Sequence, residues 1–151
     1  MPTAESRLTI NASPDVVYAA ARDSIEKLPE FLPNVDSIEV LEREANRAVS
    51  KWAGKVQTPF GAPVRFSWTE EDLWDDETLT CAFNQTEGDF DQYEGSWRFA
   101  ADGDGCETHL AISFAKNIPG LGPLIQNLLQ TKVQEMCNET LEGLKRMVEG
   151  G

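Results

Sequence analysis

The sequence is poor in the residues on which most metal centres and nucleophilic active sites depend. It contains one histidine, His109, and three cysteines, at positions 81, 106 and 137. The cysteines show no Cys-x-x-Cys spacing and His109 has no second histidine near it, so neither a zinc site nor a histidine-based catalytic triad is predicted. Three widely spaced cysteines also favour a reducing compartment over a disulfide framework.

Long apolar runs and basic residues are also scarce. No stretch approaches the roughly 20 apolar residues that a membrane-spanning helix needs, and residues 1–13 have neither the basic nor the apolar region of a secretion signal. We therefore expect a cytoplasmic protein with no stable membrane insertion. The chain has 13 Lys and Arg residues against 26 Asp and Glu residues, a net charge of −13. This charge argues against nucleic acid as a partner.

The composition is that of one globular domain. With 151 residues, of which 40% are hydrophobic and 26% charged, the chain predicts a single ligand-binding domain over residues 1–151. Alternation of apolar and polar residues predicts strands, and apolar residues three or four positions apart predict helices. The predicted strands cover residues 7–12, 37–44, 48–56, 64–72, 79–83, 93–99 and 108–114, and the predicted helices cover residues 14–27 and 123–149.

The final helix is the most informative segment. Pro123 suits its first turn, the glycines at 150 and 151 end it, and apolar residues recur along it at helical spacing. A long amphipathic helix after six strands joined by short turns predicts an α+β domain, in which an antiparallel meander curves around the helix. Such a sheet can close around an apolar space, and we expect the function to lie there.

Three segments carry a family likeness. They are INASPDVVYAAARDSIEKLPEFLPNVDSIEVLERE at residues 10–44, DFDQYEGSWRF at residues 89–99 and GCETHLAISF at residues 105–114. Together with the amphipathic final helix they resemble the START-like (SRPBCC) superfamily, in its polyketide cyclase/dehydrase and lipid-transport branch, which includes coenzyme Q-binding-like proteins. The resemblance implies a helix-grip fold, with a seven-stranded antiparallel sheet wrapped around the C-terminal helix and an apolar cavity between them. It implies members that bind lipids, quinones, polyketides or plant hormones, and a few that act as cyclases or aromatases. It brings no shared catalytic signature, so no catalytic residue is assigned.

The candidate ligand-binding residues are inward-facing aromatic side chains of the strands and residues on the first half of the final helix. Inward aromatic residues either fill a core or line a cavity, and with a facing helix they form the wall that a pocket needs. The lysine in the helical stripe either extends to solvent or anchors the polar end of a ligand. The candidates are Trp52, Phe66, Trp68, Phe83, Tyr93, Trp97, Leu124, Leu128 and Lys132.

The charged residues of the strands are expected outside the cavity. The acidic run at residues 70–72, with residues 75–77, is interpreted as a solvated hairpin edge, and its alternatives are a cation site or a paired acid and base. Alternation places Arg65, Arg98 and His109 on the outer face of the sheet. The matching inner wall is therefore expected to be mostly apolar.

Three hypotheses for function follow. The first is binding, transport or chaperoning of a small hydrophobic or amphipathic ligand, which enters past residues 31–33, 59–61 and 118–121. The second is a polyketide cyclase or aromatase that uses the same cavity, and it requires a titratable residue inside. The third is an accessory module that docks a protein partner, with a filled core and an apolar rim. No metal or other cofactor is expected, and a protein partner or a homodimer remains open.

Overall fold

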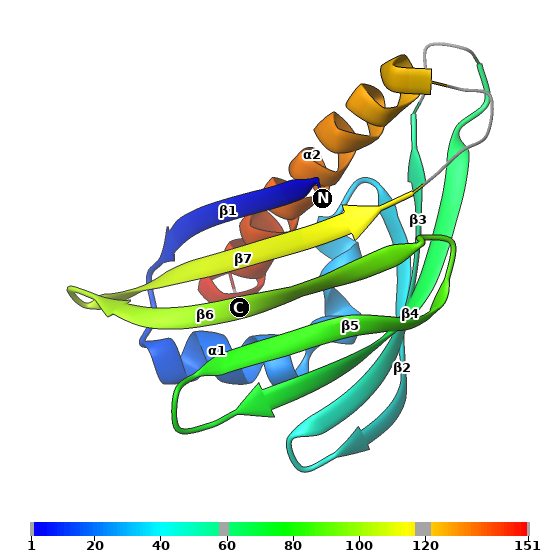
Figure 1. The fold of residues 1–151 in the computed structure, drawn as a ribbon. Coiled ribbons are helices and arrows are strands. Elements are labelled where there is room, and N and C mark those ends of the chain that lie inside the picture. The colour runs from blue at the N-terminus through cyan, green and yellow to red at the C-terminus, as the bar shows by residue number, and fades with distance from the viewer. Residues whose placement is uncertain (1, 58–60, 117–121, 151) are drawn as a thin grey trace.

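The computed structural model describes residues 2–57, 61–116 and 122–150, and it describes residues 122–125 by their backbone only. The described residues form a seven-stranded antiparallel sheet that curves around a long C-terminal helix (Figure 1). The predicted α+β helix-grip fold is therefore confirmed. In chain order the elements are β1 (Thr3–Ile10), α1 (Pro14–Asp23), the 3-10 helix η1 (Ile25–Phe31), β2 (Val35–Glu44), β3 (Arg47–Val56), β4 (Val64–Asp75), β5 (Thr80–Gly88), β6 (Gln92–Asp102), β7 (Gly105–Ala115) and α2 (Gly122–Glu149).

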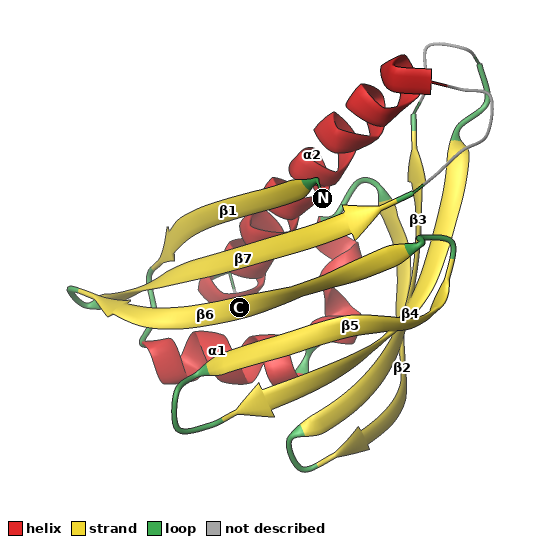
Figure 2. Ribbon diagram, viewed as in Figure 1, coloured by secondary structure: helices red, strands yellow, loops and turns green. Residues whose placement is uncertain are grey.

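The sheet is an antiparallel meander in which the first strand pairs with the last. Strands β2 to β7 pair in chain order through short connections, and β1 joins beside β7, giving the order β1-β7-β6-β5-β4-β3-β2. The helical segments lie on one side of the sheet (Figure 2). None of the helices in the described ranges has the length and apolar character needed to cross a membrane.

The first helical region differs from its prediction because it breaks in two. Ser13 caps α1 as expected, accepting a hydrogen bond from the backbone N–H of Val16, but α1 ends at Asp23 instead of continuing to residue 27. Pro29 lies inside the following η1 segment. A proline has no N–H and its ring disfavours the α-helical backbone before it, so the chain continues there as a tighter 3-10 helix.

Helix α2 packs its apolar stripe against the concave face of the sheet. Its neighbours are β1, β7, η1 and α1, so it lies toward one side of the sheet and leaves room above β3 and β4. Each aliphatic side chain that this packing buries contributes roughly 1.5–3 kcal/mol. The buried residues of the stripe are spaced four or three apart, as the periodicity predicts, and they are Leu129, Val133, Cys137, Leu141 and Leu144.

A glycine makes room for an aromatic residue of the concave face. Gly95 of β6 pairs with Phe83 of β5. A Cβ atom at position 95 would overlap the Ala111 carbonyl oxygen and would come within 2.6 Å of Cζ of Phe83. The missing side chain therefore sets both the approach of β7 and the position of the Phe83 ring.

We expect Gly95→Ala to lower the free energy of unfolding by about 1–3 kcal/mol, because the added methyl group has no space beside rigid backbone. Chemical denaturation measures this change. The neighbouring Glu94→Ala is the control, since Glu94 is exposed and its loss should change stability by no more than about 0.5 kcal/mol. Equal stability of the two variants would contradict the proposed role of Gly95.

Candidate ligand-binding site

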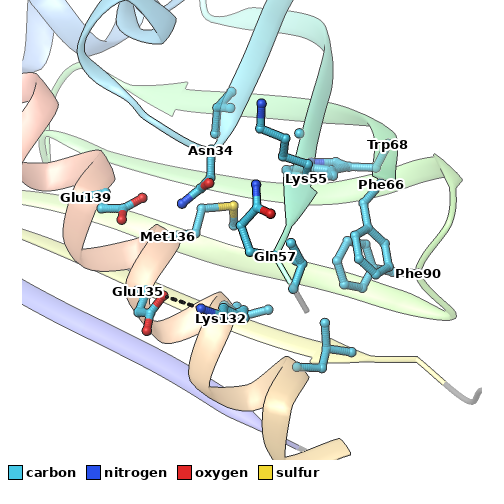
Figure 3. Close-up of a pocket in the computed structure, with 15 residues that line it drawn as sticks. Asn34, Lys55, Gln57, Phe66, Trp68, Phe90, Lys132, Glu135, Met136 and Glu139 are labelled. Carbon is cyan, nitrogen blue, oxygen red and sulfur yellow. Dashed lines mark hydrogen bonds and ion pairs between the residues drawn. The ribbon is translucent and has the colours of Figure 1, made fainter. Parts of the chain in front are cut away.

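A groove open to solvent lies between α2 and strands β2, β3 and β4. It contains about 580 Å³ of space free of atoms when the open mouth is included, and about 50 Å³ in which the centre of a water-sized sphere can move. Figure 3 shows its side chains converging from the helix and from the strands. The lining residues are Asn34, Val35, Gly54, Lys55, Val56, Gln57, Phe66, Trp68, Phe90, Leu129, Lys132, Val133, Glu135, Met136 and Glu139.

The floor of this outer groove is aromatic. The rings of Phe66 and Phe90 stack with their centroids 5.6 Å apart, and the Trp68 ring meets Phe90 edge-on at the same centroid distance. Both Phe66 and Trp68 come from β4, where alternation turns every second side chain toward α2. An apolar floor of this kind favours an apolar ligand surface.

The mouth of the groove is polar. Lys132 donates to Glu135 one turn further along α2, with Nζ 3.2 Å from Oε2 (Figure 3). Burial raises the pKa of Glu139, and a hydrogen bond from Asn34 opposes that shift. The mouth therefore carries both cationic and acidic groups, and either kind can bind the polar end of an amphipathic molecule.

A second, inner cavity lies deeper under the sheet. It offers about 20 Å³ to the centre of a water-sized sphere, which is room for roughly one water molecule. Met136 belongs to the walls of both spaces. The inner lining comes from β3 to β7 and α2, and consists of Trp52, Glu70, Phe83, Tyr93, Trp97, Leu110, Ile112, Met136 and Thr140.

Met136 is the residue that the linings of the two spaces share. Neither space alone encloses a molecule the size of a fused two-ring compound, so such a ligand needs side chains to move or must lie partly in the open mouth. Methionine is unbranched and flexible and adapts readily to a new neighbour.

Glu70 and Asp72 lie inside the protein, so the expectation of a solvated acidic edge is wrong for these two residues, whereas residues 75–77 are exposed as expected. Glu70 and Asp72 are 4% and 7% exposed. The reason is alternation: Phe66, Trp68, Glu70 and Asp72 occupy every second position of β4 and share its buried face. The inner wall is therefore less apolar than the sequence interpretation held.

Hydrogen bonds hold the two buried carboxyl groups. The indole N–H of Trp68 donates to Glu70 at 2.9 Å, and the Ser50 hydroxyl donates to Asp72 at 3.2 Å. The indole N–H of Trp52 in turn donates to Ser50 at 3.1 Å. Glu70 and Asp72 are also hydrogen-bonded to each other. Together with Ser50 of β3, these two residues of β4 form one polar row across the two strands.

Burial makes this pair retain a proton. Desolvation raises the pKa of Glu70 well above its usual range, and the nearby Asp72 charge raises it further. Burial also raises the pKa of Asp72, although hydrogen bonds from Glu70 and Ser50 oppose that shift. Two adjacent carboxyl groups in a dry site cannot both ionise cheaply, so they share one proton, held mainly on Glu70. No lysine or arginine is among the described residues that line the inner cavity.

The structure distributes the candidate residues over the two spaces. Phe66, Trp68 and Lys132 line the outer groove, whereas the other four aromatic candidates, Trp52, Phe83, Tyr93 and Trp97, line the inner cavity. Leu128 is half-buried and lines neither, while its neighbour Leu129 lines the groove. The side chain of Leu124 lies outside the described residues.

The expected mouth of the site also needs revision. Asn34 and Val35 line the groove, whereas Phe31 and Leu32 pack beside Gly143 near the other end of α2. Residues 59–60 and 118–121, which were expected at the mouth, lie outside the described residues. The sequence interpretation missed several groove-lining residues. Two of them, Met136 and Glu139, lie on the face of α2 that carries Lys132.

The outer face of the sheet carries the remaining charged candidates. Arg65 is 73% exposed in its side chain and Arg98 is exposed, as predicted. His109 faces away from α2 as expected but is only 8% exposed. It lies between Arg7 and Arg98 of the neighbouring strands, and its Nε2 is 2.8 Å from Oε1 of Glu5. Within the described ranges, no group of three or more His, Cys, Asp or Glu side chains is placed to hold a metal ion.

Fold and site together define a helix-grip protein with a cleft between its sheet and its terminal helix. The family model described as polyketide cyclase / dehydrase and lipid transport matches residues 10–139, and the chain belongs to this family. A putative polyketide cyclase from Streptomyces cyaneus is 30% identical over 118 residues, which cover 74% of this chain and 71% of the relative.

Solved structures agree with this assignment. The protein TTHA0849 from Thermus thermophilus is 37% identical, with a TM-score of 0.89 over 99% of this chain and 98% of that one. The Zhui aromatase/cyclase from Streptomyces sp. R1128 has a TM-score of 0.82 at 19% identity, over 97% and 93% of the two chains, which shows a shared fold. The predicted resemblance to the polyketide cyclase/dehydrase and lipid-transport branch is therefore confirmed.

Replacing Glu70 with glutamine should make stability less sensitive to pH. The folded protein keeps a proton on Glu70 above pH 4.5, where the unfolded chain loses it, so wild-type stability falls as pH rises from about 4.5 toward the folded-state pKa. Glutamine mimics the protonated acid. The two proteins should be similarly stable below pH 4.5. At higher pH the free energy of unfolding of the variant should exceed that of wild type by about 1.4 kcal/mol for each unit by which folding raises the pKa of Glu70.

Denaturant unfolding at a series of pH values measures this difference. Glu87→Gln is the control, because Glu87 is exposed and should follow the wild-type curve. A constant offset between wild type and Glu70→Gln at every pH would mean that Glu70 is not the group that holds the proton.

Proposed function

We propose that this protein is a cytoplasmic carrier or binder of a small apolar or amphipathic molecule, held between α2 and the concave face of the sheet. The observation that supports this best is the solvent-open groove with an aromatic floor of Phe66, Trp68 and Phe90 and a polar mouth around Lys132. The apolar part of the ligand lies on the rings, and Lys132 selects among polar ends.

Desolvation alone can supply useful affinity at such a site. Burying some 300 Å² of ligand apolar surface contributes about 7 kcal/mol before the costs of association. Those costs include moving Met136 when the ligand reaches the inner cavity. The size and flexibility of this one side chain should therefore control affinity.

We expect Met136→Ala to bind the neutral fluorescent probe N-phenyl-1-naphthylamine about three- to tenfold more tightly than wild type, because the joined space needs no side-chain displacement. Met136→Phe should weaken binding, because the larger ring fills that space. Fluorescence titration gives both dissociation constants.

Met147→Ala provides the matched control, since Met147 is a partly buried methionine of α2 outside both linings. It should bind the probe like wild type. If all four proteins fail to bind the probe, the binding proposal fails and the accessory-module hypothesis becomes the better supported one. If they all bind equally, the ligand lies elsewhere.

A second candidate function is polyketide cyclisation in the same cavity. One specific observation favours it: Glu70, a titratable residue, lines the inner cavity and shares a proton with the buried Asp72 behind it. Closing a ring between a carbonyl carbon and a carbon beside another carbonyl removes a proton from the attacking carbon and adds a proton to the oxygen of the attacked carbonyl, which becomes a hydroxyl group. That hydroxyl then leaves as water together with a second hydrogen of the attacking carbon. A carboxyl pair with one proton can perform both transfers, and the Streptomyces cyaneus relative, a putative polyketide cyclase, is consistent with this chemistry.

Turnover of a linear poly-β-keto thioester, followed as loss of water by mass spectrometry, tests the cyclase hypothesis. We expect wild type to cyclise the substrate and Glu70→Gln to be at least tenfold slower, because glutamine cannot exchange a proton. Binding of N-phenyl-1-naphthylamine by the variant should stay unchanged. Equal rates with and without wild-type protein would rule out this hypothesis and leave the binding proposal intact.

A further inference from the structure

The sheet has a second open place at the end opposite the outer groove. An open cleft of about 550 Å³ lies between the end of α1, the β2–β3 turn and the end of β4, at the lower end of the sheet in Figure 1. The outer groove is lined by residues 54–56 of β3 and residues 66 and 68 of β4. The cleft is lined by residues 47 and 48 of β3 and residue 74 of β4, so the two sites are separate.

Three arginines surround this cleft. Arg22 comes from the last turn of α1, and Arg43 and Arg47 come from the two strands of the β2–β3 hairpin. The lining contains two carboxylates, Asp23 and Asp76, so its positive charges outnumber its negative ones. The chain as a whole carries a net charge of −13. The cleft is therefore a place on an acidic protein to which an anion can be attracted.

Acidic neighbours hold the arginines in position and leave part of each guanidinium able to bind a ligand. Among the described contacts, Arg43 donates through Nη2 alone, which lies 3.0 Å from Oε2 of Glu26. Arg47 donates through Nε to Glu71 at 2.8 Å and through Nη1 to Glu42 at 3.2 Å. A guanidinium carries five N–H groups, so both arginines retain unused donors. The three acids lie outside the lining of the cleft, so they do not occupy the space that a ligand would fill.

The base of the cleft contains a hydrogen-bond donor without a partner. Trp74 lines the cleft and is 8% exposed, and its indole Nε1 is buried with no hydrogen-bond partner among the described residues. The Trp74 ring is fixed by an edge-to-face contact with Tyr18, with centroids 5.4 Å apart. A buried N–H without an acceptor costs free energy. A ligand that brings an oxygen to this ring would remove that cost.

The arrangement of the donors favours a phosphate group over a carboxylate. The donors belong to α1, β2, β3 and β4, so they approach the cleft from several directions. A carboxylate offers two oxygens in one plane, whereas a phosphate group is tetrahedral and offers oxygens on several sides. Arginine recognises phosphate oxygens with two N–H groups at once. The volume of the cleft also admits a small organic group attached to the phosphate.

We propose that this cleft binds the phosphate group of a small molecule, with Arg43 and Arg47 as its main hydrogen-bond donors and the Trp74 indole N–H donating to its deepest oxygen. Arg22, whose described donors already bind acids, contributes positive charge. Nε1 of Trp74 is covered by neighbouring atoms, so the oxygen reaches it when a flexible side chain of the cleft turns aside. The site goes beyond the proposed binding function and does not depend on it.

Two-dimensional ¹⁵N–¹H NMR of the indole groups tests this assignment. The chain has four tryptophans, and Trp74→Phe identifies the Trp74 signal by its loss. Sodium phosphate, titrated at constant pH against sodium chloride of equal ionic strength, should move the Trp74 indole proton downfield to a plateau, because the N–H gains an acceptor. The indole signals of Trp52, Trp68 and Trp97 should stay in place.

Arg43→Gln should weaken phosphate binding about five- to tenfold, because it removes a charge-assisted hydrogen bond. Arg65→Gln is the matched control: it removes the same charge from a side chain that is 73% exposed and lies outside the cleft, and it should bind like wild type. Both variants should fold, because exposed ion pairs contribute little to stability. Equal affinities of wild type and Arg43→Gln would overturn the inference.

Phenyl phosphate and acetate, titrated in the same way, identify the ligand class. Tighter binding of phenyl phosphate than of inorganic phosphate supports a phosphate ester, and the reverse supports free phosphate. Acetate that binds as tightly as either overturns the assignment to phosphate, as does the absence of a saturable Trp74 shift with both phosphates. None of these results changes the expected titration with N-phenyl-1-naphthylamine, so this inference and the proposed function can fail separately.

Discussion

The structure depends on how a single helix covers the concave face of a curved sheet. Strand alternation turns half of the side chains of β3 to β7 toward that face, and water must be excluded from them. Helix α2 does so with a stripe that runs from Leu129 to Leu144. Because α2 packs toward β1 and β7, its cover is complete on that side and incomplete above β3 and β4. The outer groove is the part of the concave face that this one helix does not fill.

The buried carboxyl pair is the second consequence of that arrangement. Placing Glu70 and Asp72 on a face of tryptophans and phenylalanines costs free energy, which the hydrogen bonds from Trp68 and Ser50 offset only in part. A protein that needed β4 only as scaffold would be more stable with apolar residues there. Residues that lower stability concentrate at functional sites, and Glu70 lines the inner cavity.

Shared architecture alone does not distinguish a carrier from an enzyme in this family. Structures that match this chain at low identity share its fold, and function is decided by the side chains that a fold places in its site. In this chain few side chains distinguish the two spaces. Met136 lines both of them, Lys132 and Glu139 line the outer groove, and Glu70 lines the inner cavity.

The amino-acid sequence by itself determined the element order, the antiparallel pairing and the inward face of each strand, because periods of 2 and 3.6 are properties of the backbone. The same alternation that turns Phe66 and Trp68 inward also turns Glu70 and Asp72 inward, and giving their charge more weight than their position produced the wrong expectation of a solvated edge. Only the tertiary structure decided that these acids are buried, that Leu129 rather than Leu128 meets the groove, and that Met136 lines both the groove and the inner cavity. These features depend on how far α2 is rotated and to which side it lies, and that is set by packing against β1, β7, α1 and η1, contacts between residues far apart in the chain that no local pattern records.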